Sequence, residues 1–355
     1  MDTQPAAEKV DQFRKTSSEG YVKLSEALPL DTPLKLMIDP ANACNFKCHF
    51  CPTGHDQLLK EVNRPKGVMD FGLFCKIIDD ASRFPQKIKS LILYKDGEPF
   101  LNKNLGKMIA YANKKCVAES IQTTTNASLI TKDKAIEILE AGLTHIRISV
   151  EHVSDQGYEE VTQIYSDYTT VRENVRFLFE EKEKRGSPLQ IHAKIIDIGF
   201  TEGEREKFLE DFTKICDSLN FDSLMGWSLS GLKDFTLETQ PQVAMNGHTK
   251  MTPIDVCPDP FYGMAINFDG TVSVCCVDWS HGTLVGNTET ETLFDIWNGK
   301  KMQDFRLRHL TGQRTTIKPC ADCQYLKTHL PIKHIDDVAP ALVEKYQTRY
   351  ARFHG

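Results

Sequence analysis

The chain has 355 residues, of which 40% are hydrophobic and 26% charged, a composition typical of a globular protein with a buried core. Its formal net charge of −6 offers no basic surface, so neither nucleic acid nor an anionic membrane is expected as a partner. The polar first thirty residues lack the apolar stretch of a signal peptide, and no apolar run is long enough to span a bilayer, which favours a cytoplasmic protein.

Short β-rich runs alternate with amphipathic helical runs from residue 35 onwards. The predicted strands are 35–40, 90–94, 120–125, 145–150, 190–196 and 222–229, and one of the helices between them begins at Thr131 and ends at Gly142. Six strand–helix units predict an α/β fold in which helices cover a parallel sheet. In such folds the chemistry lies at the carboxyl ends of the strands.

The alternating pattern stops in a linker at 236–256. Two further alternating runs are joined by Asp269-Gly270, a strong signal for a two-residue β-hairpin. A helix is predicted over 291–310, and a helical segment ends the chain. We therefore divide the chain into an N-terminal extension (1–34), a large α/β domain (35–235), the linker (236–256), a small domain (257–330) and a C-terminal helical segment (331–355).

Eleven cysteines are unusual for a reducing compartment, where disulfides are rare, so clustered cysteines indicate metal binding or catalysis. The first cluster, Cys44, Cys48 and Cys51, directly follows the first predicted strand. Three thiolates can hold a four-iron cluster while leaving one iron open, as a catalytic metal requires. The alternative is a structural zinc site, which would take a fourth ligand such as His49 or His55.

The spacing of these cysteines, their place after the first strand, and Phe50 before the last of them resemble the signature of the radical S-adenosylmethionine (SAM) superfamily. Later strand ends are similar to further motifs of that family. Gly97-Glu98-Pro99 resembles its GGEP motif, with Asp96 in place of the first glycine, and Thr125-Asn126 resembles its TNG stretch. Ser149-Val150-Glu151 resembles its S-x-D motif.

The resemblance implies a partial (β/α)6 barrel of the TIM-like kind, followed by a small domain made of a β-hairpin and a helix. It also implies that SAM is held by a cluster on the three cysteines and by neighbouring residues, which are Phe50, Gly97, Glu98, Pro99, Asn126, Ser149 and Glu151. Related enzymes often carry an arginine for the SAM carboxylate about a dozen residues after the serine. This chain has none over 159–163.

The second cysteine cluster comprises Cys257, Cys275, Cys320 and Cys323. Four thiolates can coordinate a [4Fe–4S] cluster completely, which suits electron transfer or structure, although a zinc ribbon is an alternative. Because adjacent residues of a strand point to opposite faces, only one of Cys275 and Cys276 can be a ligand, and we choose Cys275. The segment resembles the shortened SPASM, or twitch, domain of radical SAM enzymes, which implies one auxiliary [4Fe–4S] cluster.

The cysteine spacing looks most like the aminocyclitol dehydrogenase and epimerase branch. This resemblance implies that a 5′-deoxyadenosyl radical abstracts a hydrogen atom from a small, sugar-like or cyclitol-like substrate. The alcohol would become a ketone, with the auxiliary cluster as electron acceptor and a flavodoxin or ferredoxin as external electron donor. His192 and Lys194, on one face of the fifth strand, are candidates for the base or for hydroxyl binding.

Three other functions stay open. A radical epimerase would use Cys276 as hydrogen donor. A peptide-modifying enzyme would require a leader-binding module, for which residues 1–34 look too short. A non-catalytic iron–sulfur carrier or scaffold would have no need of the motifs at the strand ends.

Overall fold

The computed structural model describes residues 9, 22–239, 242–244 and 246–354. Of the predicted N-terminal extension, residues 1–8 and 10–21 lie outside this part. Six parallel strands stand side by side in the order β6-β5-β4-β3-β2-β1. They are β1 (Lys35–Ile38), β2 (Ile88–Ile92), β3 (Ala118–Thr125), β4 (His145–Val150), β5 (Gln190–Asp197) and β6 (Ser218–Ser223). The six-stranded α/β architecture predicted from the sequence is confirmed.

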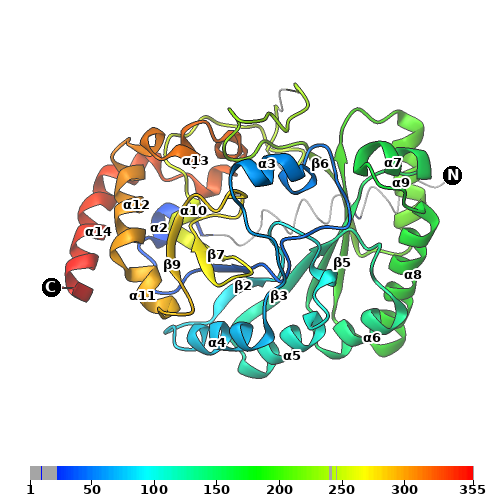
Figure 1. The fold of residues 1–355 in the computed structure, drawn as a ribbon, viewed down its shortest axis with the longest axis horizontal. Coiled ribbons are helices and arrows are strands. Elements are labelled where there is room, and N and C mark those ends of the chain that lie inside the picture. The colour runs from blue at the N-terminus through cyan, green and yellow to red at the C-terminus, as the bar shows by residue number, and fades with distance from the viewer. Residues whose placement is uncertain (1–8, 10–21, 240–241, 245, 355) are drawn as a thin grey trace.

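Helices follow the strands and lie on the outside of the sheet, as Figure 1 shows for α4, α5, α6 and α8. The helices of this half are α2 (Leu24–Ala27), α3 (Asp56–Glu61), α4 (Phe71–Ala81), α5 (Leu105–Lys115), α6 (Lys132–Glu140), α7 (Asp155–Thr162), α8 (Tyr168–Arg185) and α9 (Glu202–Phe212). The predicted bounds of α6 are confirmed. The Thr131 hydroxyl accepts a hydrogen bond from the Lys134 N–H, and Gly142 has the positive φ of +79° that follows a helix end.

The hairpin of the second half extends the same sheet. β7 (Gly263–Ile266) pairs in parallel with β1, and β8 (Thr271–Ser273) and β9 (Leu284–Asn287) follow in antiparallel order. Gly270 takes a φ of +82° between β7 and β8, where residues 267–270 form a longer connection than the two-residue turn predicted from Asp269-Gly270. The remaining helices are α10 (Asp259–Tyr262), α11 (Leu293–Asn298), α12 (Lys300–Leu310), α13 (Lys318–Ala321) and α14 (Ala339–His354). Figure 1 places α11, α12 and α14 beside this end of the sheet.

Two predicted elements were wrong in their bounds. The sixth strand was expected at 222–229 but lies at 218–223. Asn220 and Asp222 are polar, which is typical of a loop, so the sequence did not indicate a strand there. In the structure both are buried, and Asn220 donates a hydrogen bond to Asp222 at 2.6 Å. The helix expected over 291–310 is two helices that meet at Gly299, whose backbone is extended. An added Cβ at Gly299 would lie 2.6 Å from the Asp295 carbonyl oxygen.

Of the four apolar clusters among the described residues, the two largest hold these layers together. The larger one lies between the sheet and its helices and includes Leu91 and Ile121. The smaller one joins α10 to the C-terminal helices, where the rings of Phe261 and Tyr346 meet edge to face at 5.5 Å. The second core fixes the segment that precedes β7, and with it the position of the neighbouring Cys257.

His309, near the end of α12, makes folding sensitive to acid. Its side chain is 1% exposed and stacks on Phe305, and burial, helped by Arg314 and Arg308, lowers its pKa to about 3. The unfolded pKa is about 6.5, so the stabilisation is complete above that pH and is lost as the pH falls towards 3. At pH 5, which is 1.5 units below 6.5, the loss is about 2 kcal/mol.

Urea unfolding at pH 7 and pH 5 checks this prediction. The His309→Phe protein is expected to lose about 2 kcal/mol less stability than the unaltered chain over that interval. The same substitution at the exposed His248 serves as the control and is expected to leave the pH dependence unchanged. Equal acid losses in the unaltered and His309→Phe proteins would contradict the prediction.

Candidate active site between two cysteine groups

A cavity of about 260 Å³ opens at the carboxyl ends of the parallel strands. Its walls come from the loop after β1, from the ends of β2 to β6, and from a short segment after β8. Most of the predicted cofactor-binding residues line it, namely Phe50, Gly97, Glu98, Asn126, Ser149 and Glu151. Pro99 is not among the lining residues and instead begins the turn after Glu98. The predicted motifs, far apart in the sequence, are thus brought to one cavity.

The loop after β1 presents Cys44, Cys48 and Cys51 to the cavity. It is held by backbone hydrogen bonds from Lys47 N to Thr162 O (2.8 Å) and from Cys51 N to Cys48 O (3.0 Å). The two nearby histidines have other partners. His49 Nδ1 pairs with the Val161 carbonyl oxygen at 3.0 Å, and His55 Nε2 pairs with the His49 carbonyl oxygen at 3.0 Å. Among the described residues, neither ring joins the three thiols in a group whose ligand atoms all lie within 4.8 Å, as the zinc alternative would require.

The spacing of the sulfur atoms also bears on the kind of metal. Sulfur ligands of one tetrahedral zinc ion lie about 3.8 Å apart, because each Zn–S bond is about 2.3 Å. Among the described residues, the triad does not form a group whose ligand atoms all lie within 4.8 Å. The wider spacing suits a larger iron–sulfur cluster.

The thiols of the triad need a positive group to ionise. Burial raises the pKa of Cys44 to about 12, and the carboxylates of Glu98 and Glu151 add to its effect. Burial likewise raises the pKa of Cys48 and of Cys51 above the usual value. A bound metal deprotonates a thiol outright, so three buried thiols on one wall of a cavity fit a cationic cluster.

Glu98 is fixed at the end of β2 by neighbouring donors. Its Oε1 accepts hydrogen bonds from the Phe100 N–H (3.0 Å) and the Thr125 hydroxyl (2.8 Å), and its Oε2 accepts one from the Asn126 N–H (2.9 Å). Gly97 must be glycine, because an added Cβ would lie 2.2 Å from the Ala43 carbonyl oxygen. Although burial raises the pKa of Glu98, the lining position of this acid suits an ammonium group.

Asp96, which departs from the family's GGEP motif, has a structural partner. It pairs with the buried Lys95, and its Oδ2 lies 3.4 Å from His281 Nε2. Lys95 also donates to the Asp278 carbonyl oxygen at 3.1 Å. Burial raises the pKa of Asp96, but Lys95 and Arg64 outweigh it and lower that pKa below the usual value. Asp96 and Lys95 therefore connect the barrel to His281 and Asp278, in the segment after β8.

Cys257, Cys275, Cys320 and Cys323 together line a second, smaller cavity. Burial raises the pKa of every one of these thiols, to about 12 for Cys320 and about 11 for Cys323. Cys276 instead lines the main cavity. The two neighbours lie in a bend after β8, not on a strand, yet they serve different cavities. This placement supports Cys275 as the fourth ligand.

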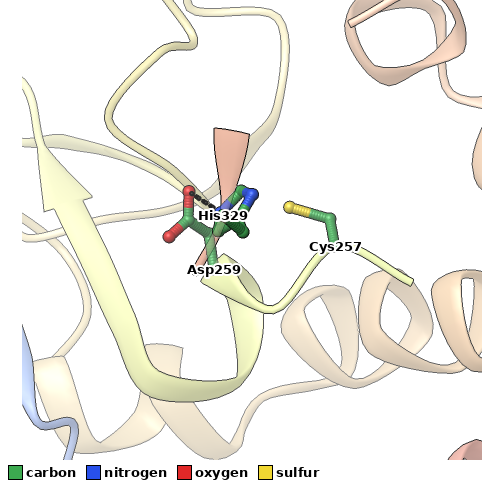
Figure 2. A group of neighbouring side chains, drawn as sticks. All are labelled: Cys257, Asp259 and His329. Atoms are coloured by element: carbon green, nitrogen blue, oxygen red, sulfur yellow. Dashed lines mark ion pairs between the residues drawn. The ribbon is translucent and has the colours of Figure 1, made fainter. Parts of the chain in front are cut away.

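Two further groups stand beside Cys257 that the sequence analysis missed. Figure 2 shows the Cys257 thiol facing Asp259 and His329, and the ligand atoms of the three residues lie within 4.8 Å of one another. His329 Nδ1 pairs with the Leu326 carbonyl oxygen, and its Nε2 lies 3.6 Å from Asp259 Oδ2. This trio could hold a single metal ion instead of contributing to a cluster.

The predicted catalytic residues are placed differently from one another. Lys194 and Cys276 line the main cavity, whereas His192 is not among its lining residues and its Nδ1 pairs with the Ser218 hydroxyl at 2.8 Å. Burial lowers the pKa of His192 to about 3. Burial raises the pKa of Cys276, although Lys35 opposes the shift. The sequence analysis missed several lining residues, among them Tyr94, Arg147, Asp222, Trp227 and Tyr325. Arg147 could have been predicted from the sequence, because residues two apart in a strand lie on one face and Arg147 therefore shares a face with Ser149 and Glu151.

Comparison with known proteins gives two family matches. The Radical SAM superfamily model matches residues 38–211, and the SPASM iron–sulfur cluster-binding domain model matches residues 257–324. A tungsten-containing aldehyde ferredoxin oxidoreductase cofactor-modifying protein of Pyrococcus furiosus is 26% identical over 62% of this chain. The match spans 57% of that relative's length, less than two thirds.

Two solved structures share the fold. BtrN in complex with AdoMet and 2-DOIA is 16% identical, with a TM-score of 0.53 over 87% of this chain and 99% of its own. SuiB of Streptococcus suis bound to precursor peptide SuiA is 15% identical, with a TM-score of 0.59 over 93% of this chain and 80% of its own. Within the described residues, no helix has the length and apolar character needed to cross a membrane.

Proposed function

Because the chain belongs to the radical SAM superfamily and carries a SPASM domain, we propose that it oxidises an alcohol of a small hydroxylated molecule to a ketone. Its cofactors are SAM, the [4Fe–4S] cluster that binds SAM, and an auxiliary iron–sulfur cluster. The observation that carries the proposal is the placement of the main cavity. Cys44, Cys48 and Cys51 line one part of it, and Cys276 and Tyr325, neighbours of the second cysteine group, line another.

When bound, these groups supply a 5′-deoxyadenosyl radical and an acceptor for one electron. Oxidation of the alcohol requires that the substrate lose one hydrogen atom from carbon, one proton from oxygen and one electron. The residues of the chain hold the substrate between the two cysteine groups and receive the proton. Tyr94 lines the cavity and is the candidate for binding the hydroxyl group.

Different residues of the chain are available to bind the ammonium group and the carboxylate of SAM. Glu98 is proposed to accept from the SAM ammonium group, with Asn126, Ser149 and Glu151 around it. The family's arginine for the SAM carboxylate does not occur over 159–163, and Lys194 is the proposed replacement. Lys194 stands opposite Ser149 in the β4–β5 register and interacts electrostatically with Cys48 and Glu151. A flavodoxin or ferredoxin in the cytoplasm is the proposed electron donor.

The Glu98→Gln protein tests the assignment of the ammonium partner. Loss of the charge is expected to weaken SAM binding about 10- to 100-fold, since a hydrogen bond to a charged group contributes about 1.5–3 kcal/mol. Equilibrium dialysis of the reconstituted protein without reductant measures this affinity. Glu119→Gln, at an exposed position of β3, is the matched control and is expected to bind SAM normally. Unchanged affinity in Glu98→Gln would count against the role of Glu98.

A radical epimerase is the second candidate, because the Cys276 thiol lines the main cavity and could return a hydrogen atom. A panel of polyols deuterated at the carbinol carbon separates the two reactions. A dehydrogenase forms a ketone, transfers deuterium to 5′-deoxyadenosine and keeps its activity in Cys276→Ala. An epimerase takes up solvent hydrogen into its product and loses that turnover in the same variant. A reductant-dependent reaction that forms neither product would contradict both candidates.

A further inference from the structure

Arg147 stands in the wall of the main cavity, and no described carboxylate makes an ion pair with it. It lies on β4, on the same face as Ser149, and its neighbours in register are Thr124 on β3 and His192 on β5. Its one hydrogen bond to a described residue runs from Nη2 to the Tyr94 hydroxyl at 3.4 Å, near the limit for such a bond. Its Nε is buried and unpartnered, and no ion pair joins it to a carboxylate in the described part of the chain.

Two other buried cations near the cavity have carboxylate partners. Lys95 pairs with Asp96, and Lys35 lies 3.7 Å from Asp259. Arg64 donates to the Thr53 hydroxyl and to two backbone carbonyl oxygens, while its Nε, like that of Arg147, has no hydrogen-bond partner in the described part of the chain. A guanidinium carries five N–H donors, and leaving a buried charge without a partner is costly. Arg147 therefore has both the unused donors and the cavity position needed to receive an anion.

The surroundings of Arg147 place it on the substrate side. Ser149 and Glu151 follow it towards the carboxyl end of β4, and Ser149 lies about 7 Å farther along the strand. Glu151 interacts electrostatically with Cys48, one of the triad. The groups that interact electrostatically with Arg147 are instead Tyr94, Asp222, Tyr325 and Cys276. Arg147 thus lies deeper than the SAM-binding motifs, towards the second cysteine group.

The nearby carboxylate does not neutralise Arg147 directly. Asp222 accepts a hydrogen bond from Asn220 Nδ2 at 2.6 Å and makes no ion pair with the guanidinium within the described residues. Its presence is compatible with a ligand that also carries hydroxyl groups, because a carboxylate accepts hydrogen bonds from them. The two side chains together can hold a hydroxylated molecule that ends in an acidic group.

We propose that Arg147 binds a carboxylate or phosphate group of the substrate, so that the enzyme acts on an anionic, hydroxylated small molecule. A guanidinium suits either group, because its paired N–H donors match two oxygen atoms. This inference rests on the proposed function, which identifies the bound molecule as a substrate. Its test measures binding without reductant, so it can fail or succeed independently of any oxidation.

The test uses the full chain, reconstituted with iron and sulfide and saturated with SAM. Isothermal titration compares glucuronate, glucose 6-phosphate and neutral glucose as probes. At least one of the anionic probes is expected to bind, with glucose at least about 10-fold weaker, and the better anion tells a carboxylate from a phosphate site. Failure of both anionic probes to bind, or equal binding of glucose, would overturn the proposal.

Two variants assign the binding to Arg147. In R147Q the anionic probe is expected to bind about 10- to 100-fold more weakly, and R147K is expected to fall between R147Q and the unaltered chain. SAM affinity and iron content are expected to stay the same in both variants, which shows that they fold. Arg83→Gln, at an exposed position, is the matched control. Unchanged probe binding in R147Q, or a loss of SAM affinity instead, would overturn the assignment.

Discussion

The Cys48→Ala protein is expected to form no 5′-deoxyadenosine from SAM and to hold about four fewer irons than the unaltered chain. Cys48 lines the main cavity with Cys44 and Cys51. Two thiolates leave a cubane with two uncovered irons, so the cluster is lost and SAM cleavage with it. Anaerobic reconstitution, iron analysis and chromatography of the nucleoside products measure both effects.

The matched control for this prediction is Cys116→Ser. Cys116 is exposed at the end of α5, and its thiol contacts the Asn113 carbonyl oxygen, far in sequence from both cysteine groups. This variant is expected to keep its iron and its SAM cleavage. If Cys48→Ala cleaved SAM as fast as Cys116→Ser, the triad would not hold the catalytic cluster.

The second large effect concerns the neighbours Cys275 and Cys276. Cys275 lines the smaller cavity with Cys257, Cys320 and Cys323, whereas Cys276 lines the main one. Cys275→Ala is therefore expected to lose about four irons, while Cys276→Ala keeps its full content. Because the two residues are adjacent, each variant controls for the other. Iron loss in Cys276→Ala with none in Cys275→Ala would reverse the ligand assignment.

Local signals in the sequence were enough to predict most of the fold. Apolar runs with flanking turn residues located the first five strands, and Thr131 and Gly142 located α6, because caps and periodicity act over a few residues. The sixth strand was misplaced because Asn220 and Asp222 are polar and yet buried. Their burial depends on a cavity built by distant segments, which no local pattern reveals.

The candidate site was predictable only where residues follow one another closely. The triad and the strand-end motifs are contiguous, and the structure gathers them at one cavity. Asp259 and His329 are seventy residues apart, and their approach to each other depends on how the C-terminal segment packs. Arg147 follows the period of its strand, but the absence of an ion pair to it among the described residues depends on how the whole chain folds.

The presence of two separate iron–sulfur clusters is tested most directly by the iron and sulfide content of the unaltered chain and of the Cys44/Cys48/Cys51 triple alanine variant. We expect about eight irons in the unaltered chain and about four in the variant, because two cubanes have separate ligand sets. About four irons falling to near zero would contradict this expectation. The second cysteine group would then hold no cluster, the trio of Cys257, Asp259 and His329 would become the metal site to examine, and the proposed electron acceptor would be lost.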